Sequence, residues 1–265
     1  MQHIPRKRFG QHFLHDPYVL SRIVEAIAPQ PGDALVEIGP GEGALTRPLL
    51  GRLPHLTAIE IDRDLAAALA AEFSPDKLTV IVADALEFDF NVLGRNLRVV
   101  GNLPYNVSTP LLFHLADFAE RVRDMHFMLQ LEVVDRMAAM HSTPAYGRLS
   151  VMLQRRFRVQ RLFRVPPGAF RPPPKVESAV VRLTPKPAAE IVPLDEKLFA
   201  TVVTRAFGAR RKTLRNALAS LIDAAELQAL GIDPGLRPEN VSPEDYIRIA
   251  IEIALKSAPG AAIAI

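Results

Sequence analysis

The 265-residue sequence contains no cysteine, no long hydrophobic run and no recognisable metal-ligand spacing. The missing cysteines exclude disulfides, zinc–thiolate sites, iron–sulfur clusters and a cysteine nucleophile. The seven histidines show no pattern such as H-E-x-x-H, so no metal is expected. No hydrophobic stretch approaches the roughly 18 residues of a membrane span, and the basic N-terminus has no hydrophobic region typical of a secretory signal. We therefore expect a cytoplasmic, soluble protein without membrane contact.

Acidic and basic residues nearly balance, with a net charge of +3, but the basic residues are clustered. Arg6–Arg8 forms one run, five arginines between Arg155 and Arg164 form a second, and the densest, Arg205–Arg215, contains no acidic residue. Such clusters favour a surface that binds a polyanion, for example nucleic acid. For any single cluster, a solvated face with acidic neighbours in space is the favoured interpretation, and it is the presence of three clusters that shifts the balance.

Strand and helix patterns alternate through the first two-thirds of the chain, which predicts a doubly wound α/β sheet with ligands at the carboxyl ends of its strands. Short hydrophobic runs predict strands at 34–39, 56–61, 78–82, 97–101 and 125–129. Helices are predicted at 17–28, 44–53, 63–73, 110–118, 132–140 and 146–157. Residues 159–165 and 178–183 predict a closing antiparallel pair.

The pattern changes near Pro185–Ala189, where a Pro/Ala-rich stretch is typical of a linker. The sequence beyond it has helical periodicity and no strand signal. We therefore predict two domains, a Rossmann-like sheet domain at residues 1–187 and a small all-α domain at residues 188–265.

Three successive predicted strands end in residues suited to a nucleotide-containing ligand. Gly39, Gly41 and Gly43 follow the first strand, where glycine lets the backbone turn sharply and approach a ligand. Glu60 ends the second strand and can accept hydrogen bonds from ribose hydroxyls, while Asp84 follows the third and can receive an adenine amino group. Each alone is compatible with an ordinary strand end. Together they predict a nucleoside-containing cofactor, and the G-x-G-x-G spacing favours S-adenosylmethionine over NAD.

The tetrad Asn102-Leu103-Pro104-Tyr105 follows the fourth predicted strand and suits an exocyclic amine on a planar base. The adenine N6 lone pair is delocalised into the ring, so this amine is a poor nucleophile. The Asn102 side-chain carbonyl and the Leu103 backbone carbonyl can accept its two N–H bonds and aim the lone pair at a methyl donor. Pro104 restricts the backbone, and Tyr105 offers a face for stacking. Without the strand-end residues upstream, the tetrad would be better interpreted as a loop with a packed tyrosine.

Phe170 lies beside three consecutive prolines in AFRPPPKVES (169–178). A phenylalanine in such a place usually packs a rigid loop. If the loop folds over the site, Phe170 becomes the second face of an aromatic sandwich around a flipped-out base.

Five segments recur in an order and spacing that resemble a known family. They are RFGQHFL (8–14), VEIGPGEGALT (36–46), EID (60–62), NLPYNVSTPLLFH (102–114) and FRPPPKVESAVVRL (170–183). Together they resemble the ribosomal RNA adenine N6,N6-dimethyltransferases, and most closely the bacterial branch that modifies two adjacent adenosines near the 3′ end of 16S ribosomal RNA. The segment AFGARRKTLRNAL (206–218) is similar to the same branch, so the resemblance covers nearly the whole chain.

The resemblance implies methyl transfer from S-adenosylmethionine to N6 of those adenosines in the 30S subunit, with a role in small-subunit biogenesis. It implies a target adenine held at Asn102–Tyr105, with Phe170 closing the pocket. The cofactor contacts that it implies are His12, Leu14, Gly39, Gly41, Glu60, Asp84 and Asn102. The family often has asparagine where this chain has His12, although a histidine can still donate or accept one hydrogen bond.

By the same resemblance, the N-terminal segment and the helical domain grip ribosomal RNA through its phosphates. The residues expected to do so are Arg6, Lys7, Arg8, Arg205, Arg210, Arg211, Lys212 and Arg215. Nothing in the sequence requires more than a monomer.

Three other functions stay open at this point. The first is an adenine methyltransferase of the erythromycin-resistance type, which acts on 23S ribosomal RNA and shares the fold and the Asn-x-Pro-aromatic tetrad. The second is an assembly protein that clamps nascent ribosomal subunits, with methylation secondary. The third, an NAD-linked dehydrogenase, is disfavoured by the glycine spacing and by the basic helical domain.

Overall fold

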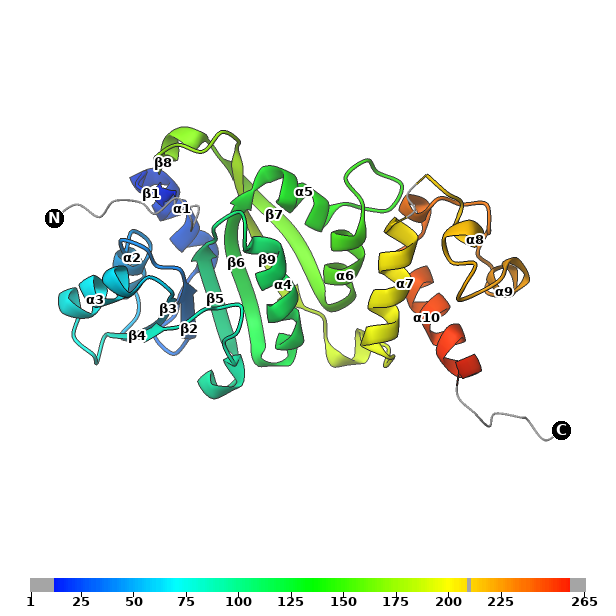
Figure 1. The fold of residues 1–265 in the computed structure, drawn as a ribbon. Helices are drawn as coiled ribbons and strands as arrows, with labels where there is room; N and C mark the ends of the chain where they lie inside the picture. The colour runs from blue at the N-terminus through cyan, green and yellow to red at the C-terminus, as the bar shows by residue number, and fades with distance from the viewer. Residues whose placement is uncertain (1–11, 209–210, 258–265) are drawn as a thin grey trace. The chain divides into compact units, whose positions relative to one another are not determined.

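The computed structural model describes residues 12–208 and 211–257, which fold into two compact units (Figure 1). The first unit takes in Met1–Val134 and Phe157–Pro185, and the second takes in Asp135–Arg156 and Lys186–Ile265. The sequence predicted one boundary after residue 187. In the structure, residues 135–156 also group with the C-terminal helices, because Tyr146 and Val151 are buried in the same hydrophobic cluster as Phe199.

A seven-stranded sheet in the order β4-β3-β2-β5-β6-β9-β7 forms the first unit. Neighbouring strands from β4 to β6 are parallel, whereas β9 is antiparallel to both β6 and β7. The strands are β2 (Ala34–Ile38), β3 (Leu56–Glu60), β4 (Leu78–Val82), β5 (Leu97–Asn102), β6 (Val122–Gln130), β7 (Phe157–Val165) and β9 (Ser178–Pro185). A separate pair joins β1 (Phe13–Leu14) to β8 (Phe170–Arg171). The predicted α/β class and the closing antiparallel pair are confirmed.

Helices cover both faces of this sheet (Figure 1). Hydrophobic residues of α1, α2 and α3 pack on one face together with the inward side chains of the strands, and α4 lies on the other face. The helices are α1 (Pro17–Ile27), α2 (Thr46–Leu50), α3 (Arg63–Glu72), α4 (Ser108–Asp117) and α5 (Leu131–Ala138). Short 3₁₀ turns are η2 (Phe90–Leu93), η3 (Ala119–Arg121) and η4 (Pro167–Ala169).

Local sequence signals explain most of these boundaries. Asp16 caps α1, since its carboxylate accepts hydrogen bonds from the amides of Tyr18 and Val19 at 2.9 and 3.0 Å, and Pro17 occupies the first turn. The predicted helices at 44–53 and 146–157 differ most in length from the observed α2 and α6 (Arg148–Arg156). Helix α2 is shorter because residues 41–45 turn before it, and the predicted helix at 146–157 ends one residue earlier because Phe157 pairs with Pro185 in the sheet.

In the part that the structure describes, the regular elements of the second unit are all helices. Its hydrophobic cluster includes Phe199 and Tyr246, both fully buried. The Tyr246 hydroxyl donates to the Pro238 carbonyl at 2.9 Å, which satisfies its polar end. The elements are α6 (Arg148–Arg156), η5 (Ala188–Glu190), α7 (Glu196–Gly208), α8 (Leu214–Ala217), α9 (Ala224–Ala229), η6 (Pro238–Asn240) and α10 (Pro243–Ser257).

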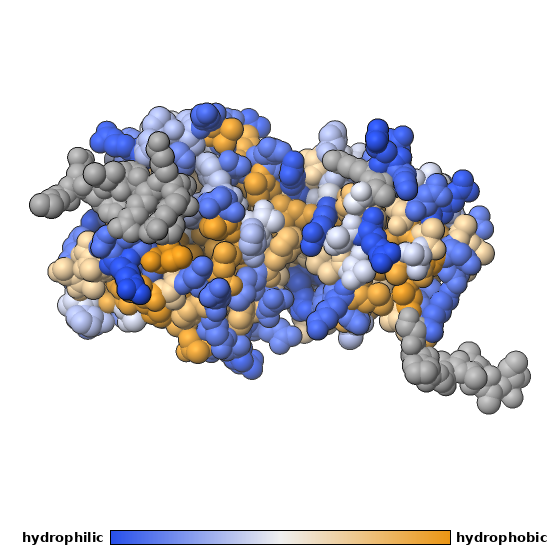
Figure 2. All heavy atoms as spheres, in the orientation of Figure 1, coloured by the Kyte–Doolittle hydropathy of each residue, from blue (hydrophilic) through white to orange (hydrophobic). Residues whose placement is uncertain are grey.

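On the face drawn in Figure 2, hydrophobic residues reach the surface in small groups separated by hydrophilic ones. Within residues 12–208 and 211–257, no helix has the length and hydrophobicity that a membrane crossing requires.

Candidate active site

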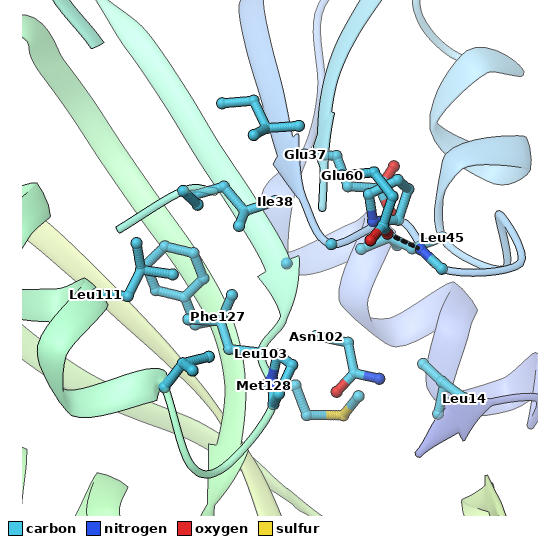
Figure 3. Close-up of a pocket in the computed structure, with 18 of the residues that line it drawn as sticks. Leu14, Glu37, Ile38, Leu45, Glu60, Asn102, Leu103, Leu111, Phe127 and Met128 are labelled. Carbon is cyan, nitrogen blue, oxygen red and sulfur yellow. Dashed lines mark hydrogen bonds between the residues drawn. The ribbon is translucent and has the colours of Figure 1, made fainter. Parts of the chain in front are cut away.

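One pocket collects the predicted site residues at the carboxyl ends of β2, β3, β4 and β5 (Figure 3). These four strands include the point where the strand order reverses, between β2 and β5, at which ligands bind in doubly wound sheets. Of the predicted residues, those that line the pocket are His12, Leu14, Gly39, Gly41, Glu60, Asp84, Asn102, Leu103, Pro104 and Tyr105.

Two glycines beside the pocket lie so close to neighbouring atoms that a side chain would not fit. Gly41 has a φ of +58°, and a Cβ there would lie 3.0 Å from the Phe13 ring. A Cβ on Gly101 would lie 2.5 Å from the Ile38 carbonyl oxygen, which cannot move aside because it belongs to the neighbouring strand. Both positions therefore require glycine, and they leave a bare backbone wall beside the pocket.

Glu60 and Asp84 present carboxylates from successive strand ends. Glu60 is only 4% exposed, and its two oxygens accept hydrogen bonds from the amides of Gly41 at 3.1 Å and Asp62 at 2.9 Å. Burial raises the pKa of Glu60, and these hydrogen bonds oppose the rise. One Asp84 oxygen accepts from the Leu86 amide at 2.9 Å. Each carboxylate keeps an acceptor side for hydroxyl or amino groups of a ligand.

Glu37 is a pocket residue that the sequence reasoning missed. Its side chain is fully buried at the end of β2 and accepts a 2.7 Å hydrogen bond from the Thr46 hydroxyl. Burial raises its pKa to about 7, and the nearby charge of Glu60 adds to the rise. Two buried carboxylates favour a cationic ligand and oppose an anionic one. The signal available in the sequence was an acidic residue inside an otherwise hydrophobic strand.

The negative charge of the pocket can be compared with the charge of each candidate cofactor. S-adenosylmethionine carries a sulfonium and an ammonium group, which suit a pocket holding Glu37 and Glu60. The pyrophosphate of NAD would place negative charge beside the same two carboxylates, which is unfavourable. The residues present fit S-adenosylmethionine.

The raised pKa of Glu37 predicts a pH-dependent stability that a Glu37→Gln variant should remove. The folded protein binds this proton more tightly than the unfolded chain, so stability falls as pH rises from about 4.5 to about 7 and stays low above it. We expect Glu37→Gln to be more stable than the wild type at pH 8 by about 3 kcal/mol and nearly equal in stability near pH 4.5. Urea unfolding without cofactor at both pH values measures this. A constant difference between the two proteins at all pH values would contradict the assignment.

Asn102 is the last residue of β5, and a backbone group distant in sequence sets the orientation of its side-chain amide. Its Nδ2 donates a 2.9 Å hydrogen bond to the His12 carbonyl, which leaves Oδ1 without a donor among the described residues. Figure 3 shows the Asn102 side chain between Leu14 and Met128, on the opposite side of the pocket from Glu60. The free carbonyl oxygen is therefore available to accept from a ligand amine.

Tyr105 is held at its hydroxyl and on its face. The hydroxyl lies 2.7 Å from the Ser178 hydroxyl on β9, within hydrogen-bond distance. The His12 ring stacks against Tyr105, with centroids 5.6 Å apart and planes 28° apart. His12 is itself fixed, since its Nδ1 donates to the Pro172 carbonyl at 2.7 Å. The tyrosine ring is thus an oriented aromatic platform at the pocket wall.

Phe170 does not line the pocket. Its ring is only 2% exposed and lies in the hydrophobic core with Leu14 and Val19. The reason is the pairing of β1 with β8, which sets Phe170 opposite Leu14. The buried position of Phe170 therefore does not support the expected role in closing the pocket. The ring that stacks on Tyr105 in this structure is that of His12.

The basic clusters separate into exposed and structural arginines. In the second unit, Arg205, Arg211, Lys212 and Arg215 are exposed, and no carboxylate pairs with them among the described residues. Arg155, by contrast, is only 3% exposed and bonds to Glu196 and to the Val192 carbonyl. Arg156 pairs with the same Glu196 at 2.8 Å. These two arginines therefore stabilise the helical unit and are not part of a free basic face.

Four of the predicted RNA contacts lie outside the described residues, namely Arg6, Lys7, Arg8 and Arg210. In the described part of the chain, no group of three or more histidine, aspartate or glutamate side chains could hold a metal ion.

Comparison with known proteins gives a consistent picture. The sequence profile of the family described as "Ribosomal RNA adenine dimethylase" matches residues 2–255. Ribosomal RNA small subunit methyltransferase A of Thiobacillus denitrificans is 61% identical over 254 residues, which is 96% of this chain and 100% of that protein.

Two solved structures are similar over most of the chain. A dimethyladenosine transferase from Plasmodium falciparum has a TM-score of 0.80 and 24% identity, over 92% of this chain and 98% of that one, which supports the fold. The 23S rRNA methyltransferase ErmE has a TM-score of 0.71 and 26% identity, over 91% of this chain and 99% of that one.

Proposed function

Because this chain belongs to the ribosomal RNA adenine dimethylase family, we propose that it methylates N6 of two adjacent adenosines near the 3′ end of 16S ribosomal RNA. The methyl donor is S-adenosylmethionine, and the product is N6,N6-dimethyladenosine in the small subunit. The chain is then a cytoplasmic, monomeric enzyme of small-subunit biogenesis.

The observation that carries this proposal is the orientation of Asn102. Its Nδ2 is already committed to the His12 carbonyl at 2.9 Å, so its Oδ1 faces the incoming amine as an acceptor. An acceptor on one N6–H, with a second from the Leu103 carbonyl, favours a more tetrahedral nitrogen and directs its lone pair. Tyr105 supports the base by stacking, and Pro104 restricts the backbone between them.

The remaining residues position the two reactants. S-adenosylmethionine, when bound, supplies an electrophilic methyl group. Gly41 and Gly101 have no side chains, so the cofactor can approach the backbone closely at these positions. The side chains of Glu60, Asp84, His12 and Leu14 line the same pocket. The N6 proton becomes acidic once the nitrogen is methylated and can leave to water, so no strong general base is required. The rate enhancement comes from positioning and from the fixed dipole of Asn102.

The exposed basic residues of the second unit, Arg205, Arg211, Lys212 and Arg215, are proposed to bind RNA phosphates. The residues Arg6, Lys7, Arg8 and Arg210, outside the described part, belong to the same proposal. Because phosphate contacts release counterions, this binding should weaken steeply with salt.

Labelled S-adenosylmethionine with unmethylated 30S subunits tests the proposal. After nuclease digestion, nucleoside chromatography should place the label in N6,N6-dimethyladenosine. Label on a 23S transcript and none on 30S subunits would instead indicate the erythromycin-resistance type of activity. Binding to 30S subunits with no transfer to either RNA would indicate an assembly protein.

The similarity to a 23S rRNA methyltransferase structure is compatible with both targets, since the two kinds of enzyme share this fold. The relative named as a small-subunit methyltransferase is 61% identical over nearly the whole chain, against 26% for the 23S enzyme. This difference favours the small-subunit target.

Two substitutions separate the ring of Tyr105 from its hydroxyl. Tyr105→Ala should raise the KM for RNA about tenfold or more, because a stacking face is lost. Tyr105→Phe keeps the ring and should stay within a few-fold of the wild-type KM, while it destabilises the fold by about 1–2 kcal/mol because the buried Ser178 hydroxyl loses its partner. Steady-state kinetics and urea unfolding measure the two effects. Equal KM values for both variants would argue against stacking.

A further inference from the structure

The His12 ring covers the aromatic platform that the proposed function assigns to the target adenine. Its centroid lies 5.6 Å from that of Tyr105, with an angle of 28° between the planes, and both residues line the pocket. Rings at this separation are in direct contact, since stacked pairs lie roughly 4.5–7 Å apart. We propose that His12 controls access to Tyr105: its ring occupies the stacking face when no RNA is bound and leaves it when the adenine stacks there.

The space between the two rings is too small for a base. Two carbon–carbon contacts of about 3.5 Å each, one on either side of the base, need about 7 Å between the rings. The centroids of His12 and Tyr105 are only 5.6 Å apart. An adenine that stacks on this face of Tyr105 therefore has to displace the His12 ring.

The covered face of Tyr105 is the one beside the proposed acceptor of the amine. The His12 carbonyl accepts a 2.9 Å hydrogen bond from Asn102 Nδ2, so His12 contacts both of the side chains that are proposed to hold the adenine. A base whose amine meets Asn102 Oδ1 lies next to the same residue. The inference rests on the proposed function, because it concerns the adenine that Asn102 and Tyr105 are proposed to bind.

The His12 ring can leave Tyr105 without a change in the main chain. Asn102 holds the His12 carbonyl, and the two residues that follow His12 form β1, which pairs with β8. The ring itself is held by the 2.7 Å hydrogen bond from Nδ1 to the Pro172 carbonyl. This bond is exposed to solvent, so water can replace it at little cost. Rotation about the two side-chain bonds of His12 therefore uncovers Tyr105.

This competition lowers the apparent affinity for the target RNA. A ligand that binds only the uncovered form has a dissociation constant raised by the inverse of the uncovered fraction. An aromatic pair of ordinary strength keeps the face covered for about 70–90% of the time. An adenine within the bound ribosomal RNA offsets this cost through the other contacts of the RNA, whereas a free nucleoside has none. The His12 ring therefore favours an adenine that is presented by its RNA.

The test compares His12→Ala with His55→Ala, a control that removes an exposed histidine ring outside the pocket. The probes are unmethylated 30S subunits with intact 16S RNA and subunits reconstituted with abasic nucleotides at the two target positions. Equilibrium affinity is measured without S-adenosylmethionine, so that contacts to the cofactor do not contribute. His12→Asn, which also lacks the ring, repeats the measurement, and thermal unfolding checks the fold of each variant.

We expect His12→Ala and His12→Asn to bind intact subunits about three- to tenfold more tightly than the wild type does. Their affinity for abasic subunits should equal that of the wild type, because no base competes for Tyr105 there. His12→Phe keeps a stacking ring and should bind intact subunits no more tightly than the wild type. The His55→Ala control should match the wild type with both probes.

An unchanged affinity of His12→Ala for intact subunits would overturn this inference. Weaker binding would also overturn it, in favour of a His12 ring that supports the base, and equally tighter binding to both probes would place the effect away from the target base. In each of these cases, methyl transfer by the wild type to 30S subunits would leave the proposed function intact. A wild-type chain that transfers no methyl group to them would refute the proposed function and this inference with it.

Discussion

Replacing Asn102 by alanine is expected to lower the rate of methyl transfer to 30S subunits by about 10²- to 10³-fold. The change removes the side-chain acceptor that we propose for the amine, and fixed dipoles at a reacting group have effects of this size. It also removes the hydrogen bond to the His12 carbonyl. Single-turnover transfer at saturating S-adenosylmethionine measures the chemical step separately from cofactor binding.

A second substitution tests orientation at the same position. The Asn102→Asp side chain has the same size, but it cannot donate to the His12 carbonyl and is therefore no longer held in place. The rate of methyl transfer by this variant should be nearly as low as that of Asn102→Ala. Asn91→Ala is the matched control, since Asn91 is exposed and lies outside the pocket. A rate for Asn102→Ala close to that of the control would show that Asn102 does not act on the amine.

Replacing Arg98 by methionine is expected to destabilise the first unit by about 3–5 kcal/mol, the largest effect on folding that we predict. Arg98 is buried on β5 and pairs with Asp33 at 2.7 Å and Asp124 at 2.9 Å. It also donates to the Ile27 carbonyl at 2.6 Å, which ties the end of α1 to the sheet. Without the guanidinium, two buried carboxylates lose their main partner.

The same network provides the control. Arg123 pairs with Asp33 at 3.0 Å but is half exposed, so Arg123→Gln should cost less than about 1 kcal/mol. Burial lowers the pKa of Arg98, but its bonds to Asp124 and Asp33 outweigh burial and raise it, so the group stays charged. Urea unfolding of both variants gives the comparison. Equal destabilisation by Arg98→Met and Arg123→Gln would show that the buried arginine contributes no more to stability than the half-exposed one.

Much of the site could be predicted because its residues occupy strand ends. Glu60, Asp84 and Asn102 each follow a hydrophobic run, and parallel strands bring their carboxyl ends to one edge. Glu37 escaped the prediction because it lies within its run. A buried carboxyl is recognisable only when its surroundings are known, here the Thr46 hydroxyl and the charge of Glu60.

The roles of the basic residues could not be predicted from the sequence either. The run from Arg155 to Arg164 is continuous in sequence, yet Arg155 is buried against Glu196 while Arg158 is exposed on β7. Charge density along a chain does not specify which side chains are buried and which are exposed. The stack of Arg22 on Phe163 joins residues far apart in the sequence, and no local pattern indicates it.

The sequence by itself determined the alternating elements, the glycine turn after β2 and the residue types at the strand ends, because caps, turns and hydrophobic periodicity act over a few residues. Only the tertiary structure decided how the active groups are held. Asn102 is oriented by His12, 90 residues away, and Tyr105 by Ser178, 73 residues away. The β1–β8 pairing buries Phe170. These contacts depend on which strands and loops meet, and that is a property of the packed fold.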